Sequence, residues 1–131
     1  MNIKTAAAAA LFLTATAFAA PDGNDNKQKT LEVFCNASAN IAHDAMLSSL
    51  KGEKRPAIQK KLEAKYVKPF AENKNLSEIM SKQVKYSLEK TAAIMKESKA
   101  AGYKPKPAEY ETLAMEVGKA EMEVCMKNLA Q

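Results

Sequence analysis

The chain contains two cysteines, Cys35 and Cys125, and their positions restrict the fold more than any other feature of the sequence. With two cysteines, only one intramolecular pairing exists. A bond between them would join an early helical segment to the last one, so these segments would lie side by side and antiparallel. In the loop-entropy model, closing such a long span stabilises a folded chain by about 4–5 kcal/mol.

The N-terminus indicates the compartment, and the compartment decides whether the cysteines pair. Residues 1–4 carry one positive charge, and an uncharged Ala-, Leu- and Phe-rich stretch follows; Ala17 and Ala19 then place small residues at the positions that a signal peptidase reads. We predict a signal peptide over residues 1–19, cleaved to leave 112 residues, and a periplasmic or secreted protein. The apolar stretch is shorter than the roughly 20 residues of a membrane span, so no transmembrane segment is expected. Lone cysteines of exported chains usually pair, which predicts a structural Cys35–Cys125 disulfide.

The first half of the remaining chain shows helical periodicity. Residues 20–29 are polar and turn-prone, so we expect a flexible leader. From Thr30, a candidate N-cap, apolar and small residues recur at three- and four-residue steps as far as Gly52, which predicts an α-helix. Pro56 suits the first turn of a short second helix. Pro69 should end that helix, because the residue before a proline is pushed out of helical geometry.

Two further helices are expected in the second half. Asn75, followed three residues later by Glu78, resembles a capping box and would open a long third helix that ends at Gly102. Pro107 can open the last helix at its first position. No segment alternates with period two. The sequence therefore predicts an all-α fold, a small four-helix bundle over residues 30–131 closed by one disulfide.

Groups suited to catalysis are sparse. His43 is the only histidine, and it stands in the middle of a helix beside Asp44. General acid–base chemistry requires such a group to be held by a second residue next to a nucleophile. The sequence has no Gly-rich phosphate loop and no clustered His/Cys metal spacing. We therefore expect a protein that is not an enzyme and carries no cofactor.

Copper binding is an alternative that the methionines raise. Thioether and imidazole groups are suitable Cu(I) ligands, and His43 and Met46 share a helix face. An antiparallel first and last helix would set His43 opposite roughly Val117, which brings Met115 nearer to it than Met122. A site of His43, Met46 and Met115 is thus one hypothesis, and ordinary core packing of the methionines is the other.

Charge is unevenly distributed. Residues 51–106 contain fifteen Lys or Arg and six acidic residues, whereas residues 107–131 contain two Lys and five acidic residues. Lys61, Lys65 and Lys68 fall on one flank of the second helix. In an exported protein such a flank would meet anionic lipid head groups, cell-wall polymers or an acidic protein, and not nucleic acid. A solvated face that keeps the protein soluble is the alternative.

Both ends of the chain resemble a known group of proteins. The similar residues are Cys35, Ala39, Ala42, Met46, Gly102-Tyr103, Glu109-Tyr110, Ala114 and the run 122–127. They are similar to uncharacterised short exported two-cysteine helical proteins of Gram-negative bacteria; the Lys-rich second helix has no counterpart there. The resemblance implies the disulfide and the helical fold but no activity. We therefore expect a soluble, non-enzymatic binding protein of the envelope-stress, inhibitor or immunity type, whose partner is a protein or an anionic envelope component.

Overall fold

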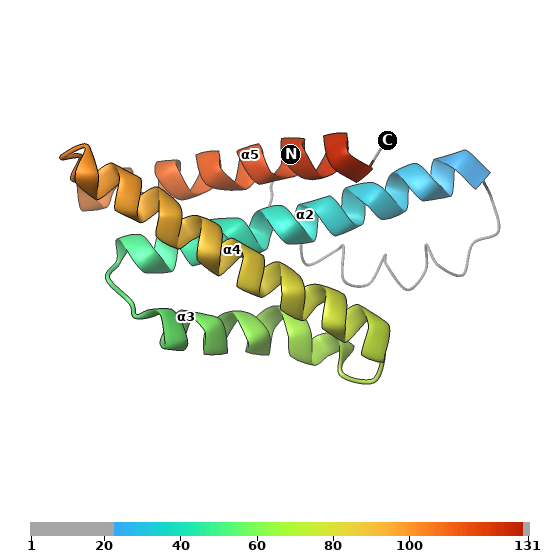
Figure 1. Ribbon diagram of the computed structural model, residues 1–131. Coiled ribbons are helices and arrows are strands. Elements are labelled where there is room, and N and C mark those ends of the chain that lie inside the picture. The colour runs from blue at the N-terminus through green and yellow to red at the C-terminus, as the bar shows by residue number, and fades with distance from the viewer. Residues whose placement is uncertain (1–22, 130–131) are drawn as a thin grey trace. The chain divides into compact units, whose positions relative to one another are not determined.

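The computed structural model describes residues 23–129, so the predicted signal peptide over 1–19 lies outside the described residues. In the described range the chain forms four α-helices and no strand (Figure 1). The helices are α2 (Gly23–Leu50), α3 (Arg55–Leu62), α4 (Lys74–Ala100) and α5 (Tyr110–Leu129). The predicted all-α four-helix bundle with its disulfide is confirmed. None of these helices is both long and apolar enough to cross a bilayer.

The chain divides into two compact units. Within the described residues, one comprises 23–40 and 118–129, and the other comprises Ile41–Val117. Helices α2 and α5 each contribute to both units, whereas α3 and α4 belong to the second unit alone.

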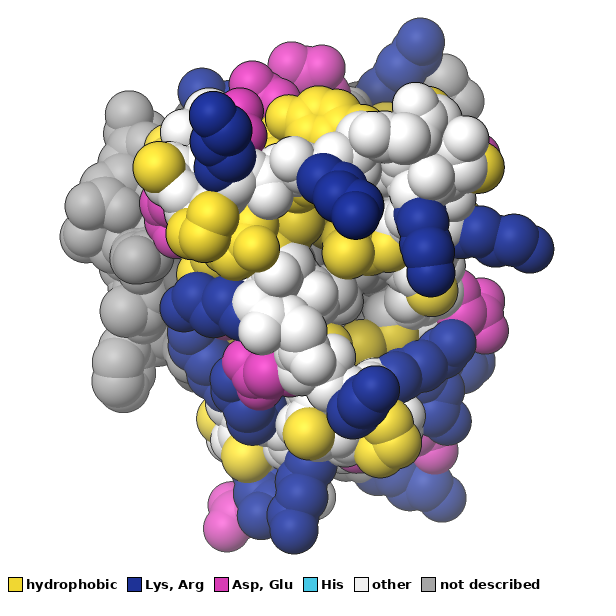
Figure 2. All heavy atoms as spheres, turned by 90° about the vertical axis from the view of Figure 1, so that its left-hand side faces the viewer, with side chains coloured by type: hydrophobic (Ala, Val, Ile, Leu, Met, Phe, Trp, Pro, Cys, Tyr) yellow, Lys and Arg dark blue, Asp and Glu magenta, His cyan; other side chains and the backbone are white. Residues whose placement is uncertain are grey.

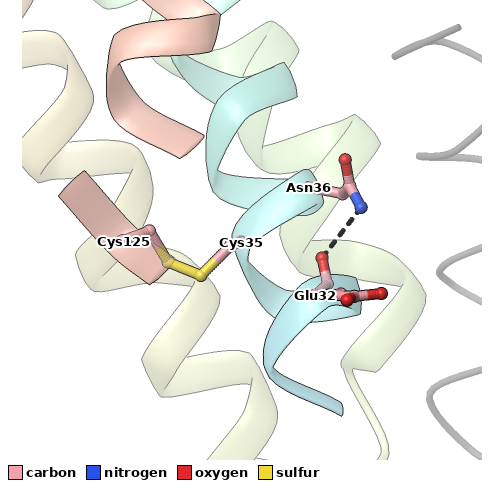
Figure 3. The surroundings of a disulfide bond; sticks show 4 residues. All are labelled: Glu32, Cys35, Asn36 and Cys125. Carbon is pink, nitrogen blue, oxygen red and sulfur yellow. Dashed lines mark hydrogen bonds between the residues drawn. A yellow bond between two sulfur atoms is a disulfide. The ribbon is translucent and has the colours of Figure 1, made fainter. Parts of the chain in front are cut away.

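The disulfide belongs to the first unit. Cys35 of α2 and Cys125 of α5 are bonded, their Cα atoms are 5.5 Å apart, and both residues are buried (Figure 3). Beside them, the side-chain amide of Asn36 donates to the backbone carbonyl of Glu32 over 2.9 Å. The bond therefore ties α2 to α5 in this unit, as the sequence predicts.

Two groups of apolar residues form the interior of the second unit. In one, Met46 and Leu50 of α2 pack with Ala114 of α5. Partly buried side chains surround them: Leu47, Ile94, Met95, Tyr110, Leu113 and Val117. In the other, α4 lies against α3 and the turns that follow it, and both sides contribute buried residues. These are Ile58, Leu62, Tyr66, Met80, Val84 and Leu88.

Helix α2 begins earlier than the sequence suggests. It starts at Gly23, so the prediction that Thr30 caps the first helix is wrong, and residues 23–29 of the predicted flexible leader are helical. The other end is as predicted. Gly52 has a φ of +87°, a left-handed conformation that favours glycine, and its N–H donates to the carbonyl of Ser49 over 3.0 Å.

Pro69 does not act as predicted. Regular α3 ends at Leu62, but the chain stays helical through a π-turn, η1 (Glu63–Val67), and a 3-10 turn, η2 (Lys68–Phe70). Lys68, directly before Pro69, keeps a helical φ of −55° and ψ of −38°. Its N–H donates to the carbonyl of Glu63, five residues back. The wider turn precedes a proline whose ring would collide with the carbonyl four residues earlier in a regular helix.

The start of α4 is two residues earlier than predicted, and its cap is a different asparagine. Asn73 is the N-cap, and its Oδ1 accepts from the N–H of Leu76 over 3.1 Å, so the assignment of this role to Asn75 is wrong. Gly102, with a φ of +76°, follows the end of α4 as predicted. Pro107 opens a short 3-10 turn, η3 (Pro107–Glu109), that leads into α5, so the α-helix itself begins three residues later than predicted.

Candidate functional site

Five polar side chains of the second unit form one connected cluster, in which three contact the carboxylate of Asp44 and the fifth, Glu111, contacts His43. Helix α2 supplies His43 and Asp44, the π-turn η1 supplies Lys65 and Tyr66, and α5 supplies Glu111. We call these five residues the Asp44 cluster. Within it, two consecutive residues of η1 both reach Asp44, so the cluster connects three elements that are distant in sequence.

His43 lies between two carboxylates. The residue is 4% exposed; its Nδ1 is 2.9 Å from Oδ1 of Asp44, and its Nε2 is 2.9 Å from Oε1 of Glu111. A neutral imidazole has one N–H, whereas an imidazolium has a donor at each nitrogen. The geometry therefore fits the charged ring. The hydrogen bond with Asp44 raises the pKa of His43 above its usual 6.5; burial opposes this shift and Glu111 adds to it.

Asp44 accepts hydrogen bonds at both carboxylate oxygens. Besides the contact with His43, its Oδ2 accepts from the hydroxyl of Tyr66 over 2.6 Å and from Nζ of Lys65 over 2.9 Å. Burial alone would raise the pKa of this carboxyl group, but the hydrogen bonds from His43, Tyr66 and Lys65 outweigh burial and lower the pKa to about 2. Asp44 is therefore ionised at neutral pH. Burial and the adjacent Asp44 charge raise the pKa of Tyr66, which keeps its hydroxyl protonated as a donor.

The Asp44 cluster is a set of satisfied groups that hold elements together. Each imidazole nitrogen of His43 faces a carboxylate, and the Tyr66 hydroxyl is a donor to Asp44. A general base needs a free lone pair directed at a substrate proton, and this arrangement gives His43 none. The cluster is suited to fixing α2, η1 and α5 relative to one another within the second unit.

The three residues of the copper hypothesis have different environments. His43 has both nitrogens engaged as described; Met46 packs with Leu50 and Ala114 in the apolar interior; and Met115 is 40% exposed on α5. Copper binding by His43 would therefore require one of its carboxylate contacts to break. Between residues 23 and 129, no three His, Cys, Asp or Glu side chains are grouped so that they could hold a metal ion.

The predicted anion-binding lysines are all exposed, but two of them are already paired. Lys61 contacts both carboxylate oxygens of Glu53, at 2.8 and 3.0 Å. Lys65 contacts Asp44, and its Nζ also lies 5.3 Å from the ring centre of Tyr66. Lys68 forms no ion pair with any residue in the described range. The structure thus places Lys65 in the Asp44 cluster and leaves Lys68 available to solvent.

Three further cations, which the sequence also places near this flank, stand on the same segment. Lys54, Arg55 and Lys60 are exposed and form no ion pair with the described part of the chain. We call these three residues together with Lys61, Lys65 and Lys68 the lysine face. In Figure 2, lysine and arginine side chains surround the lower part of the view, where α3 lies, with few acidic side chains among them.

Sequence reasoning identified His43 and Asp44 as neighbours but did not identify Tyr66 or Glu111 as their partners. A usable signal exists, since a buried histidine needs polar partners, and those that its own helix does not supply must come from elsewhere in the chain. Nothing in the sequence says which residues these are.

Comparisons with family models, with curated proteins and with solved structures found no match for this chain.

Proposed function

We propose that this protein is exported and acts, without catalysis, by binding an anionic surface of the cell envelope through the lysine face. One observation carries the proposal: Lys54, Arg55, Lys60 and Lys68 are exposed on one short segment and have no ion-pair partner among the described residues. Between residues 54 and 70 the only acidic residue is Glu63. Such a surface attracts phosphate-bearing head groups.

The paired lysines of the face have a supporting role in this proposal. Lys61 and Lys65 each have a carboxylate partner, yet their side chains are 58% and 64% exposed. Their partners reduce the local positive charge, so the four other cations supply most of the attraction. Each Lys or Arg near an anionic membrane surface contributes about 1 kcal/mol at moderate ionic strength. Four such residues are enough for reversible binding that depends on salt.

Two further observations support export and a non-catalytic role. The Cys35–Cys125 disulfide is a feature typical of oxidising compartments. His43, the only histidine of the sequence, is buried and engaged at both nitrogens. The resemblance to short exported two-cysteine proteins adds to the case for export. None of these observations favours the copper hypothesis.

Sedimentation with vesicles tests the proposal. We expect the oxidised protein to bind phosphatidylglycerol-containing vesicles at low salt and not to bind pure phosphatidylcholine vesicles. Retention should fall steeply between about 20 and 150 mM salt, because the Debye length shortens over this range. The double variant Lys60→Gln/Lys68→Gln should bind about thirtyfold more weakly, given about 1 kcal/mol per charge.

A matched control separates the lysine face from net charge. Lys96 and Lys99 are exposed lysines of α4, and Lys96→Gln/Lys99→Gln removes the same two charges from another helix. This control should retain most of the binding. Equal loss in both double variants would show that net charge alone is responsible, and absence of binding at low salt would remove the proposal.

A further inference from the structure

We infer that His43 is a proton-operated link between α2 and α5: the protonated ring bridges Asp44 and Glu111, and loss of one proton to solvent breaks the contact with Glu111 and loosens the first turn of α5. All three residues belong to the second unit. The inference does not rest on the proposed binding function, because it concerns only contacts within this unit.

The geometry requires two donors from one ring. Both nitrogens of His43 are 2.9 Å from a carboxylate oxygen, within hydrogen-bond distance at each end. In the neutral ring one nitrogen carries a lone pair and no hydrogen. That lone pair would face a carboxylate at the same distance, which is repulsive. The neutral ring therefore keeps one of the two contacts at most.

Of the two contacts of His43, the one with Glu111 is lost and the one with Asp44 is kept. Asp44 is adjacent to His43 on the same helix, and Tyr66 and Lys65 hold its other oxygen. The side chain of Asp44 is 23% exposed, whereas that of Glu111 is 49% exposed. Moving away from the ring would cost Asp44 its contacts with Tyr66 and Lys65, whereas the half-exposed Glu111 side chain reaches water.

The charges around the ring reinforce this outcome. In the described part of the chain, Asp44 of α2 and Glu111 of α5 are the charged groups in direct contact with the imidazole. Lys65 and Tyr66 of η1 act on it through Asp44, and Tyr66 stays neutral because its pKa is raised. Deprotonation removes the positive charge that stands between the carboxylates of Asp44 and Glu111, which favours separation of the ring from Glu111.

The pH direction follows from the raised pKa of His43 in the folded protein. The unfolded chain has the usual value of 6.5. The contribution of the link is therefore fully present below pH 6.5 and is lost as the pH rises through the higher folded-state pKa. An exported protein meets the pH of its surroundings, so this link would respond to alkaline conditions.

Two measurements on the oxidised protein test the link. NMR titration of the His43 ring should give a midpoint above 6.5. Hydrogen exchange of the amides of residues 114–117, whose partners are the carbonyls of the first turn of α5, reports opening of that turn. After correction for the intrinsic pH dependence, we expect this exchange to rise on the order of tenfold between pH 6 and pH 9, the factor that a hydrogen bond between charged groups typically provides.

The variant Glu111→Gln and a matched control complete the test. Glu111→Gln removes the charge but keeps the size of the side chain, so the midpoint of His43 should fall and the exchange should become nearly independent of pH. Glu116→Gln removes the same charge from an exposed position of α5 and should behave like the unmodified protein. A His43 midpoint that is the same in Glu111→Gln as in the unmodified protein, or exchange of residues 114–117 that does not change with pH, would overturn the inference.

Discussion

The hydroxyl of Tyr66 donates to Oδ2 of Asp44 over 2.6 Å, across 22 residues of sequence, and this contact fixes the π-turn η1 to helix α2. Tyr66 is buried at the same time among the apolar residues between α3 and α4. One side chain thus contributes to the apolar interior and to the Asp44 cluster. The donor is neutral and the acceptor is charged, which makes this a comparatively strong hydrogen bond.

Tyr66→Phe should destabilise the protein although the ring is kept. The substitution removes a hydrogen bond to a charged group, which stabilises by about 1.5–3 kcal/mol. Urea unfolding at pH 7 measures the loss. Tyr103→Phe is the control, because Tyr103 is 45% exposed and no change in the unfolding midpoint is expected there. Equal midpoints for the unmodified protein and Tyr66→Phe would show that the contact contributes nothing.

Asp44 should give the protein a characteristic loss of stability in acid. The pKa of this carboxyl group is about 2 in the folded protein and 3.8 in the unfolded chain. The corresponding stabilisation is fully present above pH 3.8 and is lost as the pH falls toward 2; it amounts to about 2 kcal/mol. Unfolding measured from pH 5 to pH 2 checks this. Asp44→Asn should be less stable at pH 5 and should lose less over the same range, and parallel curves would contradict the assignment.

Removal of the disulfide should lower stability by several kcal/mol. The bond closes a span of 90 residues, for which the loop-entropy model gives about 4–5 kcal/mol. Guanidinium unfolding of the oxidised protein and of Cys35→Ala/Cys125→Ala measures this difference. Circular dichroism should show that the variant remains helical. A change below about 1 kcal/mol would mean that the unfolded chain is already compact without the bond.

Two asparagines near the start of α4 should respond differently to the same substitution. Asn73→Ala removes the side chain that accepts from the N–H of Leu76 and should cost about 1 kcal/mol. Asn75 lies inside the first turn of α4 and is not its cap. Asn75→Ala should therefore raise the helix propensity at this position without removing a capping contact. Thermal unfolding of both variants tests this. If Asn75→Ala were the more damaging of the two, the helix would start later than the structure has it.

Several helix boundaries could be predicted from the sequence because they depend on the local steric properties of glycine and proline. Gly52 and Gly102 have positive φ angles at the ends of α2 and α4, as expected of the residue with no Cβ, and Pro107 opens the turn before α5. Two other boundaries were predicted wrongly, the start of α4 and the end of the helical segment at Pro69. Asn73 and Asn75 are equally acceptable caps on sequence grounds, and Lys68 remains helical before Pro69. In both places the packing of neighbouring elements selects among local conformations of similar energy.

The sequence by itself determined that this chain is helical, where most helices end, and that α2 and α5 are joined by Cys35 and Cys125. These properties depend on residue type and spacing along the chain. Only the tertiary structure decided the Asp44 cluster, because the periodicity of a helix defines a buried face but not the register against its neighbour. A shift of one turn keeps the same face buried and changes every polar partner. The sequence set His43 opposite roughly Val117, and in the folded protein it meets Glu111.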